Sequence, residues 1–159
     1  PGLHKVLAES PQAYEGYQLL HKLFTETDFD ADEMTVVWQA INVEHECHYC
    51  VPAHTGIAKM MKVSDEITQA LRNETPLPTA RLEALRTFTI QMVRARGNVS
   101  AAQMQAFFDA GYGHRAVLDV VLGLAQKTMS NYINHMAQTP VDAVFQPLAW
   151  TRGDSPLAA

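Results

Sequence analysis

The chain has 159 residues, a formal net charge of −5 and an isoelectric point near 5.7. This length suffices for one domain with its own hydrophobic core, so we expect a single domain over residues 1–159. Its 12 Lys and Arg residues are scattered along the sequence, and this distribution argues against a nucleic-acid-binding protein.

The sequence also bears on the compartment. The longest nearly apolar stretch, residues 116–125, is too short to span a bilayer and contains Asp119, so we expect no membrane segment. The opening Pro-Gly-Leu-His-Lys lacks the basic region and apolar run of an export signal, which predicts a cytoplasmic protein. Two cysteines three residues apart cannot form the long-loop disulfide framework of secreted domains. They therefore suggest redox or metal chemistry.

Helical periodicity and capping residues recur along the whole chain, and strand patterns are missing, which predicts an all-α fold. The patterns Asp30-x-x-Glu33 and Ser100-x-x-Gln103 are capping boxes, and Ser10 precedes Pro11 at a first helical position. Beyond Asp142 we expect a tail packed by Phe145 and Trp150, followed by a frayed end. The predicted helices begin near Ser10, Asp30, His48, Ser64, Thr79, Ser100 and Gly113, and the last of them runs to about Gln138.

The two cysteines belong to the third of these helices, and Pro52 limits where that helix begins. Proline is tolerated in the first helical turn, where backbone N–H groups lack intrahelical partners, but not further in. We therefore expect the helix to start within two residues of His48, which places the Cys47-x-x-Cys50 motif at its N-terminus.

Cys47, Cys50 and His54 are separated by three and four residues, a spacing that brings side chains together on one helix face. Dithiol chemistry requires an attacking thiolate, a resolving thiol close to it and a group that moves protons near neutral pH. The helix dipole at the first turn, together with a protonated His54, would favour a Cys50 thiolate. We therefore predict that Cys50 is the reactive thiol and that Cys47 closes the disulfide.

A carboxylate near the histidine would orient it and accept protons. Glu33 opens the preceding helix and would lie beside His54 if that helix folds back through a turn near His45. Glu44 lies in the turn, closest to Cys47. The sequence leaves both carboxylates as candidates.

The run Glu44-x-x-Cys47-His-Tyr49-Cys50-Val-Pro-Ala-His54-Thr resembles the core of the AhpD-like branch of the carboxymuconolactone decarboxylase family. The resemblance extends from the helix that opens with Glu33 to the segment from Asn131 and the late Trp150. It implies an AhpD-like helical bundle that assembles as a homo-oligomer and has no bound cofactor or metal. It also implies that both cysteines, His54 and a glutamate relay reduce peroxides, or the disulfide of a partner peroxiredoxin, with electrons from a dithiol donor.

The chain departs from the family pattern at two positions. The family glutamate commonly lies twelve residues before the first cysteine, where this chain has Thr35. Some members have a histidine directly before the second cysteine, where this chain has Tyr49. The identity of the relay carboxylate is therefore open between Glu33 and Glu44.

Other interpretations of the motif remain. On the simplest of these interpretations, the cysteines have no chemical role and are ordinary buried packing residues. A zinc site would combine Cys47, Cys50 and His54 with His45 or His48. The enzymatic hypotheses are a peroxidase that reduces hydroperoxides and a reductase for a partner disulfide or a lipoamide-like carrier. A zinc-binding or redox-sensing module is the non-enzymatic alternative.

Overall fold

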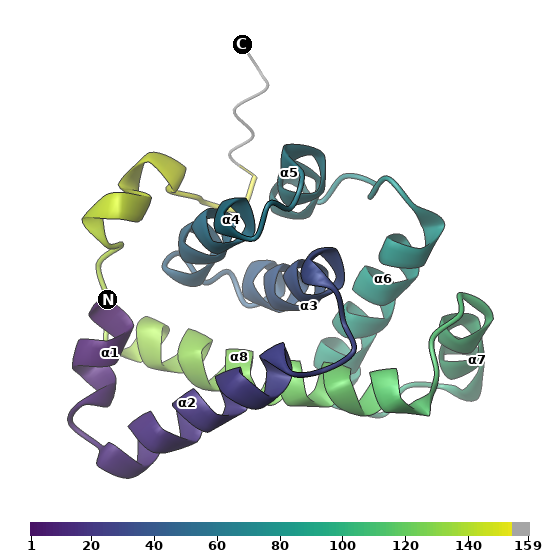
Figure 1. Ribbon diagram of the computed structural model, residues 1–159, viewed down its shortest axis with the longest axis horizontal. Coiled ribbons are helices and arrows are strands. Elements are labelled where there is room, and N and C mark those ends of the chain that lie inside the picture. The colour runs from purple at the N-terminus through teal and green to yellow at the C-terminus, as the bar shows by residue number, and fades with distance from the viewer. Residues whose placement is uncertain (154–159) are drawn as a thin grey trace.

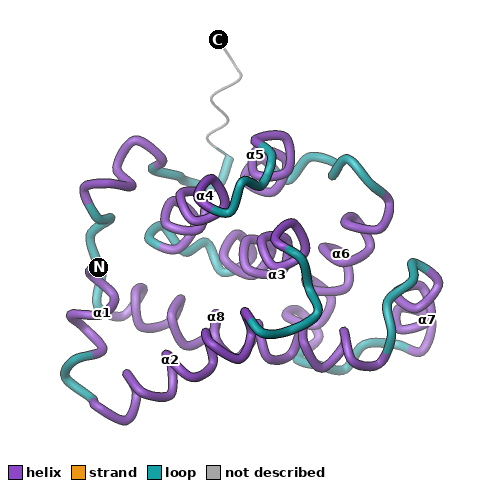
Figure 2. Tube along the Cα trace, in the orientation of Figure 1, coloured by secondary structure: helices purple, strands orange, loops and turns teal. Residues whose placement is uncertain are grey.

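The computed structural model describes residues 1–153, which form helices and loops without a strand (Figure 2). The predicted all-α fold is therefore confirmed. Eight α-helices and one 3₁₀-helix lie in this range: α1 (Gly2–Leu7), α2 (Pro11–Thr25), α3 (Ala31–Glu44), α4 (Cys50–Met60), α5 (Asp65–Asn73), α6 (Ala80–Ala95), α7 (Ala101–Asp109), α8 (His114–Met136) and η1 (Ala143–Leu148).

The capping residues start the helices as their sequence pattern predicts. Ser10 accepts a hydrogen bond from the Ala13 N–H, and the capping boxes at Asp30 and Ser100 are both formed. Helix α1 was not predicted. Its six residues are too few for a periodic signal, and it is held in place because Leu3 and Leu7 are buried.

Helix α3 lies at the centre of the molecule and contacts α4, α5, α6 and α8 (Figure 1). Every residue from Thr35 to Val43 is buried. A helix that is buried on all sides must carry its polar side chains inside the protein, where they need hydrogen-bond partners. The polar residues of α3 are therefore placed to form a site.

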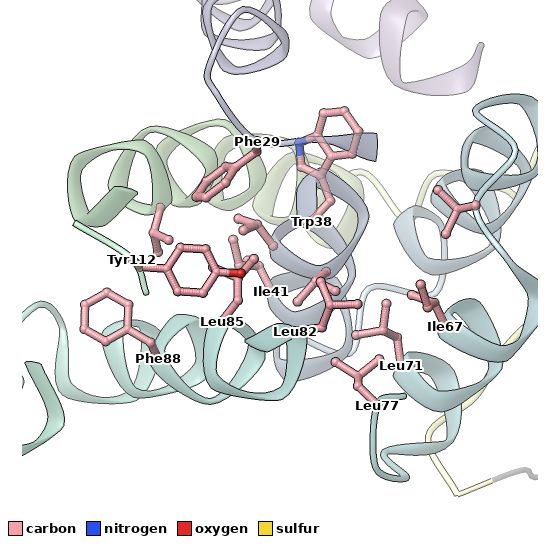
Figure 3. Close-up of a cluster of buried hydrophobic side chains, with 14 of the residues drawn as sticks. Phe29, Trp38, Ile41, Ile67, Leu71, Leu77, Leu82, Leu85, Phe88 and Tyr112 are labelled. Carbon is pink, nitrogen blue, oxygen red and sulfur yellow. The ribbon is translucent and has the colours of Figure 1, made fainter. Parts of the chain in front are cut away.

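The main hydrophobic core joins α3 to α5 and α6 (Figure 3). Ile41 of α3 lies in this cluster with Leu71 of α5 and Leu85 of α6. Phe107 extends the core toward α7 by stacking against both Phe88 and Tyr112. The same cluster includes Ala58 of α4 and Val120 of α8, so helices on several sides of α3 contribute to the core that surrounds it.

The C-terminal tail packs back onto α4 and α5, as predicted from its aromatic residues. Phe145 of η1 lies against Gly56, and the Trp150 Nε1–H donates to the Arg72 carbonyl at 3.0 Å. The predicted frayed end, at residues 154–159, lies outside the described residues. Within residues 1–153, no helix combines the length and the apolar character needed to cross a membrane.

Helix α8 approaches α2 and α3 closely at Gly123. A Cβ atom there would lie 2.6 Å from Phe24 Cε2 and 2.9 Å from Val37 Cγ1. Gly123→Ala should therefore lower the free energy of unfolding by about 1–3 kcal/mol through overpacking, measured by urea denaturation.

Gly16 in α2 is the matched control, because a Cβ there would meet nothing within 4 Å. Gly16→Ala should raise the free energy of unfolding by about 0.5–1 kcal/mol. Equal stability of Gly123→Ala and the wild type would contradict the close approach of α8.

Candidate active site

The two cysteines lie where the chain turns from α3 into α4. Helix α4 begins at Cys50 and has Pro52 in its first turn, which confirms the predicted start. Cys47 precedes the helix, and its carbonyl accepts the Val51 N–H at 3.0 Å. Its Sγ accepts the Cys50 N–H at 3.2 Å, so the sulfur of one cysteine caps the backbone of the other.

Both thiols are free and buried, with exposed fractions of 0% for Cys47 and 2% for Cys50. Cys50 borders a cavity of about 170 Å³ that lies between α1, α2, α4, α8 and η1. His54 and Lys127 border the same cavity. The rest of its wall is largely apolar and aromatic, with Leu3, Tyr17, Tyr49, Ala53, Ile57 and Phe145 among its residues.

Helix α8 brings a buried polar face to the motif. Lys127, Asn131 and Asn134 follow one another at spacings of four and three residues, and all three are buried. The Lys127 Nζ lies 2.8 Å from the Nε2 of His54. The Asn134 amide donates to the Sγ of Cys50 at 3.3 Å.

The surroundings of Cys50 stabilise its thiolate. Burial by itself raises the pKa of Cys50, but several opposing interactions outweigh it. These are the hydrogen bond from Cys47, the positive charge of Lys127 and the amides of Asn134 and Asn131, which together lower the pKa to about 6. The pKa of Cys47 is raised instead, by its hydrogen bond to Cys50 and by burial. The attacking role of Cys50 and the resolving role of Cys47 stay predictions.

The expectation of a protonated His54 is wrong. Burial lowers the pKa of His54 well below its usual value, and the charge of Lys127 lowers it further. The imidazole is therefore neutral at pH 7, and its Nε2 accepts a hydrogen bond from the Lys127 ammonium. The positive charge beside Cys50 comes from Lys127.

A chain of buried side-chain hydrogen bonds links α3, α4 and α8 behind the thiols. Asn131 donates to Asn42 at 2.9 Å, and Asn42 donates to Gln39 at 2.9 Å. Gln39 in turn donates to the Val51 carbonyl and to the Thr55 hydroxyl of α4. Because these amides satisfy one another, the three helices are held in one arrangement around Cys50.

Neither predicted carboxylate lies at the thiols. Glu33 closes the capping box of α3, accepts from Tyr112 at 3.0 Å and pairs with Arg81 at 3.2 Å. Glu44 pairs with Arg94 at 2.6 Å on the side of α3 that faces α6. Helix α3 does pack against α4 as predicted, but the α3 side chain beside His54 is Trp38, with its ring centroid 4.9 Å from that of the imidazole. The group that contacts His54 Nε2 is Lys127.

The histidines of the zinc interpretation also have other partners. His45 Nδ1 bonds to the Asn131 side-chain oxygen, and His48 Nε2 donates to the Thr139 carbonyl, both at 3.0 Å. Residues 1–153 contain no group of three His, Cys, Asp or Glu side chains arranged to hold a metal ion. A zinc site at the motif therefore lacks its further ligands in this part of the chain.

No protein-family model and no curated protein matches this sequence. Solved structures do match it, and two of them cover most of the chain. The first, from Ralstonia eutropha JMP134, is described as "alkylhydroperoxidase AhpD core: uncharacterized peroxidase-related protein". Its TM-score to this chain is 0.79 at 19% sequence identity, and the match covers 87% of this chain and 75% of that one. This chain has the AhpD-like fold. The second, an "uncharacterized peroxidase-related protein" from Silicibacter sp. TM1040, gives a TM-score of 0.73 at 17% identity and covers 83% of this chain and 71% of that one.

The AhpD-like fold places two residues at the site that the sequence analysis did not assign to it. These residues are Lys127 and Asn134, and neither is among the site residues predicted from the sequence. The sequence contains one signal for them. Lys127, Asn131 and Asn134 follow Val120 and Gly123 at helical spacing, which indicates polar side chains on the buried face of α8.

Loss of the Asn134 amide should make the Cys50 thiolate less stable. Asn134→Leu removes a hydrogen bond to a charged group while nearly conserving volume, and should raise the pKa of Cys50 by roughly 1–2. The measurement is the rate of iodoacetamide alkylation at Cys50 against pH, with the site identified by peptide mass.

Ser130→Ala is the control, because the buried Ser130 hydroxyl donates only to the Lys127 carbonyl on its own helix. This variant should retain the wild-type alkylation profile. An unchanged profile in Asn134→Leu would show that the amide does not stabilise the thiolate.

Proposed function

We propose that this chain is a dithiol peroxidase in which Cys50 reduces a small hydroperoxide and Cys47 resolves the product. The observation that carries the proposal is the environment of Cys50, a buried sulfur that accepts a hydrogen bond from Asn134 and borders a cavity. A thiol with a pKa of about 6 is largely ionised at pH 7 and is therefore a nucleophile there.

The proposed cycle has three steps. The Cys50 thiolate attacks the distal oxygen of the hydroperoxide and the O–O bond breaks, which gives a sulfenic acid and an alcohol once the departing oxygen takes a proton. The Cys47 thiol then attacks the sulfenic sulfur, so that a disulfide forms and water leaves. A dithiol donor reduces the disulfide and returns both cysteines to their starting state.

The burial of the cysteines favours a small substrate over a folded partner. Exchange with a protein disulfide requires the attacking sulfur to reach the partner sulfur directly, and Cys50 is only 2% exposed. A cavity of about 170 Å³ with apolar walls suits a small organic hydroperoxide. Reduction of a partner disulfide or of a lipoamide-like carrier is the alternative that the same residues would support.

Peroxide consumption with dithiothreitol as donor tests the proposal. Cys50→Ser should abolish the turnover of tert-butyl hydroperoxide, because the serine hydroxyl is not ionised at pH 7. With dithiothreitol left out, Cys47→Ser should react once and stop at a sulfenic acid, which dimedone traps on Cys50.

Turnover by Cys50→Ser at the wild-type rate would exclude Cys50 as the nucleophile. A wild-type protein that reduces lipoamide but consumes no peroxide would support the partner-disulfide alternative. Both assays use the same preparation, and circular dichroism verifies that each variant is folded.

A further inference from the structure

The proposed peroxidase reaction requires an acid in the cavity. The identity of this acid is inferred below, and the inference rests on the proposed function. When the O–O bond of an alkyl hydroperoxide breaks, the departing alkoxide is a strong base that leaves readily only if it is protonated as it departs. The acid must therefore border the same cavity as Cys50.

Most titratable side chains around the cavity are poor acids at neutral pH. Burial lowers the pKa of both His54 and His4, so both imidazoles are neutral. The Tyr49 hydroxyl donates to Asp142 at 2.6 Å, and burial together with this hydrogen bond raises its pKa. The groups that a sequence pattern would select as proton donors are therefore unsuited to this step.

Lys127 differs from these groups in charge and in partners. It is 1% exposed and borders the cavity, and its Nζ lies 2.8 Å from His54 Nε2. Among the described residues, no carboxylate forms an ion pair with it. An ammonium has three N–H groups, and the contact with His54 uses only one of them.

We propose that Lys127 is the acid of this site and that its ammonium protonates the oxygen that departs when Cys50 attacks a hydroperoxide. His54 is then a positioning residue: its neutral Nε2 accepts one N–H and so directs the ammonium at the cavity. In this proposal Lys127 and His54 take the proton-transfer role that the resemblance implies for a histidine and a glutamate.

The protons of the cycle balance among Cys50, Cys47 and Lys127. In the first step a thiolate, a hydroperoxide and an ammonium become a sulfenic acid, an alcohol and a neutral amine. Disulfide formation with Cys47 then releases water. When the donor dithiol regenerates both thiols, the proton lost as Cys50 ionises returns to the Lys127 amine. The thiolate and its acid are therefore restored together.

Lys127→Arg separates the charge of this residue from its acidity, because a guanidinium remains positive but does not give up its proton in proteins. The variant should retain the wild-type pH profile of Cys50 alkylation by iodoacetamide. Its single-turnover rate with tert-butyl hydroperoxide should fall roughly 100-fold or more, the contribution typical of a positioned acid. Its rate with peracetic acid should change little, because acetate departs without being protonated.

Two further variants complete the experiment. Lys59→Arg makes the same exchange on the exposed part of α4 and should behave like the wild type. If arginine does not fit into the buried space of Lys127, Lys127→Met tests the same role. At a pH at which Cys50 is ionised in both proteins, Lys127→Met should show the same selective loss with tert-butyl hydroperoxide.

The outcomes are distinguishable. Equal effects on the two peroxides, or wild-type rates with tert-butyl hydroperoxide, would overturn the role of Lys127 and leave the peroxidase proposal intact. A wild-type protein that consumes neither peroxide would overturn the proposed function and this inference with it.

Discussion

The contact between the Lys127 ammonium and His54 is the interaction on which the proposed chemistry of this protein depends. A buried charge is costly unless it is paired or hydrogen-bonded. Here the imidazole accepts one N–H, and the ionised Cys50 supplies a negative charge that the lysine stabilises. The two buried charges thus reduce each other's cost. His54 is neutral because burial lowers its pKa and the charge of Lys127 lowers it further.

The position of this lysine is set by the packing of α8. Gly123 lies one helical turn before Lys127 and allows α8 to approach α2 and α3 more closely than any side chain would permit. The amides of Asn131 and Asn42 then bond across the helix interface. Steric fit therefore sets the distance between the helices, and hydrogen bonding sets which residues of α8 face the thiols.

The acidic residues of α3 have structural contacts. Glu33 joins the start of α3 to Tyr112 and Arg81, while Glu44 pairs with Arg94 of α6 near its other end. Both ion pairs lie at least partly in solvent, where such contacts contribute little to stability individually. Their consequence for the site is indirect. Glu33 and Glu44 are held by arginines away from the thiols, and the α3 side chains that bond to α4 and α8 near Cys50 are the amides of Gln39 and Asn42.

The sequence by itself determined the local features of this protein. Capping residues and Pro52 set the helix starts, because these depend on backbone groups within a few positions along the chain. For the same reason the spacing of Cys47, Cys50 and His54 was sufficient to identify the motif. Only the tertiary structure decided the protonation of His54 and the partner that it contacts. Lys127 lies 73 positions away in the sequence, and its charge acts on the thiol only after packing has excluded water between them. The electrostatic effect of one residue on another depends on their distance in space and on their burial. Helical periodicity within one segment gives no information on either.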